Sequence, residues 1–362
     1  MFFAKSLCHT NGFNLRSSKS ETTSPAGFPA YFALYESIFC PSRRPSGFIQ
    51  LHYPAISSHA DVFECAKRLR LNPASTREEL ASTLSPNGSI VQSVKDNAIR
   101  SVIRVMFMLD CSLKDMYSPN FKVGDYSPTS WEASDSFVSY VERALPKQEG
   151  AFDAYKHKKN LKAWKLKKRY KLQFRPTDNI TEHLLYDPLT RTVHVFHHTA
   201  YLKAHLRPSK DEPIDQQASE SLKLGMLPPR LLLETLYTIH FILFPASNDP
   251  RGRSGKLLSS LIRKETFDPD AKFVEYIRDI PAQLQYQYWN VRLEQLYNVV
   301  RNPPPRNRFV SWVERHTSER NALAVAIIGL FLSALFGLLA CVIGLAQLAV
   351  SVLAWKRPKE PS

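Results

Sequence analysis

Glycine is scarce in this sequence, at 12 of 362 residues, whereas proline is plentiful at 25. This composition favours helices interrupted by prolines over a glycine-rich β protein. The five cysteines stand far apart and form no CxxC pair, which excludes a disulfide scaffold and a zinc ribbon. Hydrophobic residues make up 44% of the chain, so disorder throughout is excluded as well.

Recognisable catalytic motifs are also missing. The segment NDPRGRSGK (248–256) is not a phosphate-binding loop, because Pro250 stands at the first glycine position and Leu257 replaces the required Ser or Thr. Ser254 does not complete a GxSxG motif, since residue 256 is lysine. No HExxH zinc motif occurs either. The sequence therefore favours a non-enzymatic protein and predicts no cofactor.

The strongest positive signal lies at residues 322–355, which contain no Asp, Glu, Lys, Arg, His or Pro. A membrane-spanning helix needs about 20 apolar residues, and buried helices of soluble proteins seldom run so long. No turn residue or charge interrupts the segment, so we predict one long transmembrane helix in preference to a hairpin that bends near Gly337. Residues 356–362 form a short basic tail.

The flanks of this segment predict a tail-anchored protein. Met1–Phe3 lead directly into Lys5, so no secretory signal peptide is expected, and the N-terminal region is predicted to be cytosolic. The endoplasmic reticulum and the mitochondrial outer membrane both remain open as locations. Within the segment, small residues recur at spacings that let two helices approach closely, which predicts self-association through Gly329, Ser333, Gly337 and Gly344. The alternative is that small residues are simply common in such helices.

The rest of the chain is predicted to be mainly α-helical with a small β-hairpin. Residues 1–30 are expected to be disordered, and 31–300 to form a mainly helical cytosolic region. That region is one unit or two subdomains with a break at 207–229. A proline-rich spacer and a juxtamembrane helix follow at 301–321. Capping boxes at Ser75–Glu78 and Ser89–Gln92 open two helices, and apolar spacing over 91–109 predicts a buried core helix.

Residues 156–175 carry ten Lys or Arg side chains and no acidic one, against a net charge of +15 for the whole chain. As one helix, the segment would align Lys158, Lys162, Lys165 and Arg169 in a basic stripe, with Lys168 beside it. Such a segment can bind anionic lipid, an acidic protein or, less favoured for a membrane-anchored chain, nucleic acid. The alternative is a solvated helix face.

Five of the eleven histidines lie between residues 177 and 206. The turn at Asp187-Pro188 predicts a β-hairpin there. The weak metal-ligand candidates are His183, His194 and His198, beside Asp178 and Glu182. Structural histidines are the favoured interpretation, and convergence of one of these histidines with Asp178 or Glu182 in a concave site would favour an enzyme or a metal-binding module.

The segments LKAWKLKKRY (161–170), TDNITEHLLYD (177–187), VHVFHHTAYLKAHL (193–206) and ERNALAVAIIGLFLSALFGLL (319–339) resemble an uncharacterised family of filamentous-fungal proteins with a C-terminal membrane anchor. The resemblance covers most of residues 30–355 and implies a fungal membrane protein, with no activity attached. CorA-type metal transporters also end in membrane helices, but the two spans and the Gly-Met-Asn signature of that family are missing here.

Together these features predict a tail-anchored adaptor or scaffold whose basic segment binds an acidic partner or anionic lipid. An enzyme or metal module built on the hairpin at 183–205 is the alternative. An oligomeric channel or transporter subunit is less favoured, because only Gln347 and Ser351 bring polar groups to the later part of the apolar segment.

Overall fold

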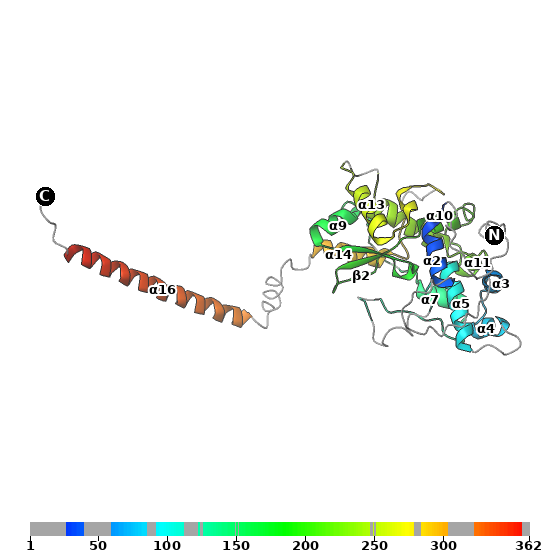
Figure 1. Cartoon of the computed structure of the whole chain (residues 1–362), viewed down its shortest axis with the longest axis horizontal. Coiled ribbons are helices and arrows are strands. Elements are labelled where there is room, and N and C mark those ends of the chain that lie inside the picture. Colours follow the sequence, from blue (N-terminus) through cyan, green and yellow to red (C-terminus); the bar gives the residue numbers. More distant parts are fainter. Residues whose placement is uncertain are drawn as a thin grey trace, which may run out of the picture. The chain divides into compact units, whose positions relative to one another are not determined.

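The computed structural model describes residues 27–39, 59–84, 92–111, 122–123, 126–148, 150, 152–246, 249, 251–278, 284–302 and 322–356. The chain divides into two compact units, Met1–Arg301 and Asn302–Ser362. The described residues are mainly helical, with one small sheet in the first unit and a long apolar helix in the second. The predicted fold class is thereby confirmed (Figure 1). Most of the predicted segments 1–30 and 301–321, and the tail after residue 356, lie outside the described residues.

The N-terminal half of the first unit consists of short helices around one core helix. These are α2 (Pro29–Phe39), α3 (His59–Leu71), α4 (Arg77–Leu84), α5 (Gln92–Phe107) and α7 (Phe137–Ala144). Helix α5 is the predicted core helix, with Ile99, Ile103 and Phe107 fully buried. The buried thiols of Cys65 on α3 and Cys111 after α5 belong to the same core.

The predicted capping box at α4 lies one residue further along the chain. Thr76 accepts a hydrogen bond from the amide of Glu79 at 3.2 Å, and the carboxylate of Glu79 accepts one from the amide of Thr76 at 3.0 Å. The same reciprocal chemistry therefore operates with Thr76 as the N-cap in place of Ser75. The second predicted box, at Ser89, lies outside the described residues.

A three-stranded sheet forms the middle of the unit, in the order β1 (Gln173–Thr177), β3 (Thr192–Phe196), β2 (Tyr186–Asp187). Strand β2 pairs antiparallel with β3, as the hairpin prediction required. Its turn is fixed by Asp187, which accepts hydrogen bonds from the amide of Leu189 at 2.8 Å and the hydroxyl of Thr190 at 2.5 Å. Strand β1 was not predicted and pairs parallel with β3.

The prediction of one basic helix over 156–175 is wrong. The segment forms α8 (Ala154–His157), a turn, α9 (Ala163–Tyr170) and then β1. Lys171 ends α9 in the left-handed conformation, at φ 60°. From Gln173 onward the chain bonds to β3, so tertiary pairing overrides the helical preference of the lysines. Within α9 the apolar side chains Ala163 and Leu166 are buried and face the core.

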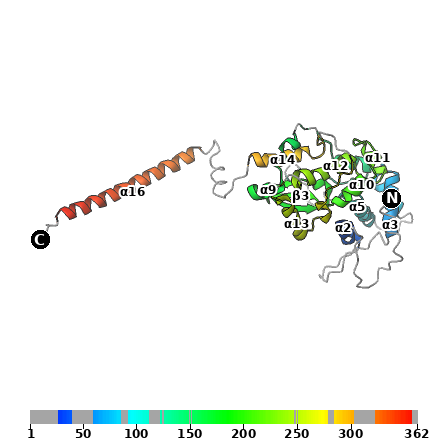
Figure 2. The ribbon, with the colours of Figure 1, turned by 90° about the horizontal axis from the view of Figure 1, so that it is seen from above.

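The remaining helices enclose the sheet. They are η1 (Ile180–Glu182), α10 (Thr199–Leu206), α11 (Ala218–Lys223), α12 (Pro229–Tyr237), the π-helix η2 (Thr238–Leu243), α13 (Arg253–Glu265), η3 (Pro269–Lys272) and α14 (Asn290–Arg301). Residues 207–229, the position of the possible subdomain break, contain α11 and lie within the first compact unit. Helices α9 and α14 lie at one end of the first unit and α3 at the other in both views (Figures 1 and 2).

A buried carboxylate ties α12 to the chain that leads into α14. Glu234 is fully buried and accepts hydrogen bonds from the amides of Gln287 at 2.8 Å, Tyr288 at 2.9 Å and Trp289 at 3.4 Å. The indole of Trp289 donates to the hydroxyl of Thr235 at 2.9 Å, one residue along the helix.

In the second unit, α16 (Ala322–Lys356) is a single uninterrupted helix. Residues Ile328–Leu353 are long and apolar enough to cross a membrane. This matches the prediction of one helix without a hairpin. Ser333 donates its hydroxyl to the carbonyl of Gly329 at 2.9 Å, so its O–H donor is used inside the helix.

Candidate functional sites

The parallel pairing of β1 with β3 brings one acid and two histidines together. Thr177 and Phe196 are partners at the carboxyl ends of the two strands, so the residues that follow them emerge side by side. The Oδ1 atom of Asp178 lies 3.1 Å from Nε2 of His197 and 2.7 Å from Nε2 of His198. Both imidazoles are buried, whereas the carboxylate is partly exposed. We call these three residues the histidine cluster.

The hydrogen bonds of the histidine cluster fix the proton on one ring. The amide of Asp268 donates to Nδ1 of His197 at 3.1 Å, so in neutral His197 the proton is on Nε2, which donates to Asp178. Burial alone would raise the pKa of Asp178, but the bonds from His197 and His198 hold it well below its usual value. Burial lowers the pKa of His198 to about 4, with the neighbouring His197 adding to the shift.

The composition of the cluster matches a two-histidine, one-carboxylate metal site, and its ligand atoms lie within 4.8 Å of one another. Metal binding at Nε2 of His197 would require a lone pair there and the proton on Nδ1. Metal-bound histidines normally donate that second N–H to an acceptor, but here Nδ1 faces the amide N–H of Asp268, another donor. The donor set as arranged fits a hydrogen-bonded cluster and does not fit a metal centre.

The structure brings only one of the three metal-ligand candidates, His198, to Asp178. His183 is fully buried, accepts at Nδ1 from the amide of Phe196 at 3.2 Å, and lies with Nε2 2.7 Å from the hydroxyl of Thr238. His194 lies half-buried within β3 and is not a member of the histidine cluster. His197, which was not among the candidates, takes their place. The missing signal was the parallel strand β1, without which Asp178 and His197 do not become neighbours.

The basic segment presents an array of cations around α9. Lys167, Lys168 and Arg169 are exposed, while Lys158, Lys162 and Lys165 are half-buried. Lys162, Lys165 and Arg169 share one side of α9 by the helical period, whereas Lys158 lies in the preceding turn. Burial lowers the pKa of Lys165, and the charges of Arg169, Lys162 and Lys159 lower it further. The segment therefore concentrates charge of one sign.

Within this array the charge of Lys162 helps to lower the pKa of Asp249, but carboxylate partners are missing for the other cations in the described part of the chain. Among the described residues, none of Lys158, Lys165, Lys168 and Arg169 forms an ion pair with a carboxylate; the pairs present lie elsewhere in the unit. Lys165 instead donates to the carbonyl of Lys159 at 2.6 Å. The first turn of α13, which packs against α9, adds Arg253 above the ring of Trp164 at 4.5 Å.

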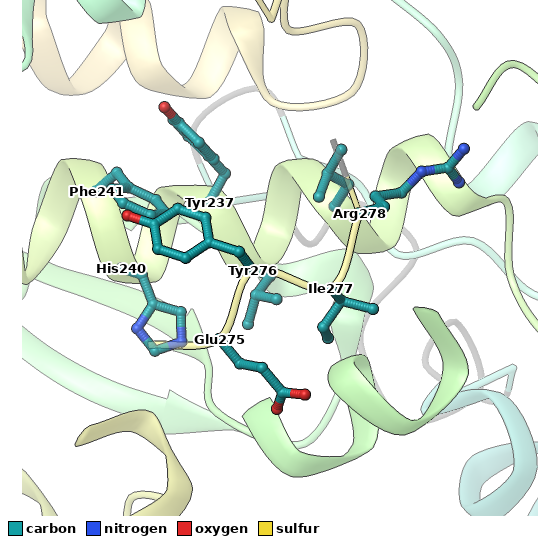
Figure 3. Close-up of a pocket in the computed structure, with 9 residues that line it drawn as sticks. Tyr237, His240, Phe241, Glu275, Tyr276, Ile277 and Arg278 are labelled. Atoms are coloured by element: carbon teal, nitrogen blue, oxygen red, sulfur yellow. The ribbon is translucent and has the colours of Figure 1, made fainter. Parts of the chain in front are cut away.

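Aromatic side chains gather next to this array, over α12 and the π-helix η2. Tyr237, Phe241 and Tyr276 line a pocket together with the buried His240 (Figure 3). The cavity within the pocket is about 20 Å³, which is room for a single water molecule. A second pocket, of about 340 Å³, is lined mostly by polar and charged residues of α4 and α5, among them Arg77, Lys95 and Asp96. Neither is the enclosed apolar pocket typical of a small-molecule site.

Comparisons of the chain with protein-family models, with curated proteins and with solved structures find no match. Function is therefore inferred from the two features just described, the histidine cluster and the basic array around α9.

Proposed function

We propose that this chain is a non-enzymatic, tail-anchored membrane protein whose basic array binds an anionic partner. The array is defined as Lys158, Lys162, Lys165, Lys168 and Arg169. The folded N-terminal unit would lie in the cytosol, where it would act as an adaptor or scaffold. The side chains of the histidine cluster are hydrogen-bonded to one another and to the backbone, as in a structural element. This supports a binding role over catalysis.

The observation that supports the proposal is the concentration of positive charge in the array, where Lys158, Lys165, Lys168 and Arg169 have no carboxylate partner among the described residues. Surface lysines normally lie among acids of opposite sign, but here the nearest charges that act on Lys165 are three other cations. Repulsion between like charges raises the free energy of the folded unit, and binding of an anionic ligand would lower it. Helix α16, long and apolar enough to cross a bilayer, supports a location at a membrane.

The test uses the full chain in nanodiscs of neutral phosphatidylcholine. Binding of two anionic probes, phosphatidylserine vesicles and soluble polyglutamate, is measured by fluorescence anisotropy or light scattering. The key variant is Lys165→Glu/Lys168→Glu/Arg169→Glu. A basic residue near an anionic surface contributes about 1 kcal/mol, so the triple reversal should weaken binding by about a hundredfold or more.

The matched control reverses three exposed lysines elsewhere, Lys67→Glu/Lys210→Glu/Lys223→Glu, which changes the net charge equally. It should bind like the wild type. Equal losses in both variants would show that only net charge matters, and the proposal would fail. Binding of the wild-type chain that survives about 1 M salt unchanged would also contradict it, since salt at that level screens exposed charges beyond about 3 Å.

A further inference from the structure

We propose that an aromatic ridge beside the basic array docks the folded unit onto the interface of an anionic bilayer. The ridge consists of Tyr155, Tyr237, Phe241 and Tyr276. This inference rests on the proposed function, because the basic array supplies the positive charge that it requires. It also specifies the partner as lipid headgroups and the adjoining acyl boundary, and not an acidic protein.

Three of the four rings, those of Tyr237, Phe241 and Tyr276, form a continuous row. The rings of Tyr237 and Phe241 stack with centroids 4.4 Å apart, and those of Phe241 and Tyr276 lie 5.8 Å apart. Figure 3 shows the rings of Tyr237, Phe241 and Tyr276 side by side. Burial raises the pKa of Tyr237, and Tyr155 and Tyr276 are both close enough to raise it further. Tyr155 therefore lies in the neighbourhood of Tyr237, at one end of this row.

The outer members of the ridge are unusually exposed for aromatic residues. Tyr276 is 73% exposed and Tyr155 is 54% exposed, while Tyr237 and Phe241 are partly buried. The neighbouring acid, Glu275, is already paired with Arg207, whose guanidinium donates to both carboxylate oxygens. Because it is paired, Glu275 presents no unbalanced negative charge that would repel an anionic surface.

The ridge is joined directly to the basic array. The ammonium group of Lys158 lies 3.4 Å from the centroid of the Tyr155 ring. Helix α9 contacts η2, the π-helix that carries Phe241. A basic and an aromatic side chain thus lie together at Lys158 and Tyr155, and the helices that carry the array and Phe241 are neighbours. Tyrosine places an apolar ring and a polar hydroxyl together, which suits the boundary between headgroups and acyl chains, and basic residues hold the anionic headgroups themselves.

A bilayer fits this surface better than a protein partner does. Protein interfaces anchor their central aromatic or arginine residues in well-packed pockets, but the cavity within the ridge admits only one water molecule. A bilayer needs no pocket. In addition, α16 keeps the unit tethered to its membrane, and a short tether raises the effective concentration at the surface to the millimolar range. Even weak affinity for lipid is then sufficient for docking.

The experiment compares the full chain in nanodiscs of phosphatidylcholine with the full chain in nanodiscs that also contain phosphatidylserine. Hydroxyl-radical footprinting with mass spectrometry reports the exposure of Tyr155 and Tyr276, and lysine acylation reports that of Lys165 and Lys168. Oxidation of both tyrosines should fall about threefold or more when phosphatidylserine is present, since each basic residue near an anionic surface favours binding about fivefold. Leu71 on α3, at 67% exposure, should be oxidised equally in both discs.

A variant separates the ridge from the array. In Tyr155→Ser/Tyr276→Ser, acylation of Lys165 and Lys168 in phosphatidylserine discs should rise towards its value in neutral discs, whereas Leu71→Ser should leave it unchanged. Lysines that are protected while the tyrosines stay fully oxidised would overturn this inference and leave the proposed function standing. Lysines protected only by added polyglutamate would assign the surface to an acidic protein and overturn it too. No protection of either kind would refute both proposals.

Discussion

The carboxylate of Glu234 accepts a hydrogen bond from the amide of Tyr288 at 2.9 Å, although the two residues are 54 positions apart in the chain. Two further amides, of Gln287 and Trp289, donate to the same side chain. One buried acid thus determines where the chain enters α14. Burial raises the pKa of Glu234 to about 7, against the effect of these donors.

Replacing this carboxylate should destabilise the fold strongly. Glu234→Ala would leave up to three amides without an acceptor, and an unsatisfied buried group costs about 1–3 kcal/mol. The free energy of unfolding should therefore drop by roughly 3 kcal/mol or more, as measured by urea denaturation of the full chain in micelles. Glu234→Gln keeps one oxygen and should lose less. The exposed control Glu294→Ala should stay within about 0.5 kcal/mol of wild type; an equal loss there would contradict the assignment.

Acid should weaken the first unit. Burial lowers the pKa of His198, His205 and His240 to about 4 each. The unfolded chain, with histidine pKa values near 6.5, therefore binds more protons than the fold between about pH 4 and 6.5. The stability from these histidines is complete above about pH 7 and is lost as the pH falls through that window. Glu234 and Asp268, whose pKa values are raised by burial, act in the opposite direction, but the three histidines outnumber them.

Thermal melts of the full chain followed by circular dichroism should show a lower Tm at pH 5 than at pH 7.5. His240→Phe should flatten this dependence, because it removes one histidine that is neutral in the fold. The exposed His59→Asn should leave the profile unchanged. A Tm that rises on acidification would show that carboxyl groups such as Glu234 dominate instead.

The histidine cluster should be a hydrogen-bond element without a stoichiometric metal. Long-range ¹H–¹⁵N spectra of the full chain in micelles should place the proton of His197 on Nε2 and leave Nδ1 unprotonated, because Nδ1 accepts from Asp268. Addition of Zn²⁺ should not reverse this pattern. Removal of one partner, in Asp178→Ala, should lower stability by roughly 1–3 kcal/mol. A His197 proton found on Nδ1, together with retained metal, would establish the metal site after all.

Helix α16 should self-associate through its small residues. Gly329, Ser333, Gly337 and Gly344 share one face by the 3.6-residue period, and a Cβ built at any of the three glycines meets no atom within 4 Å. Gly337→Ile should therefore reduce dimerisation in a bacterial two-hybrid membrane assay, because close approach of two backbones would be blocked. Ala346→Ile, on the opposite face, should have no effect. Unchanged dimerisation in Gly337→Ile would reject this interface.

Local patterns in the sequence predicted the elements whose structure depends on their own residues. Helix α5 and the turn at Asp187 follow from apolar spacing and from one side chain, and α16 follows from its composition. The lysines of 156–175 favour a helix equally well, but their last part became β1 because β3 offered backbone partners. Only that distant pairing brings Asp178 to His197 and His198. The ridge of Tyr155, Tyr237, Phe241 and Tyr276 likewise draws on three segments that no local pattern connects.

The buried cysteines of the core carry a practical consequence. Burial raises the pKa of Cys65 and of Cys111 to about 12, so neither thiol ionises at cellular pH, and thiolates are the species that react. These two side chains are therefore insulated from cellular oxidants while the core is closed. Their rate of alkylation in the intact protein would then measure how often the region around α3 and α5 opens, and it would serve as a built-in probe of local unfolding.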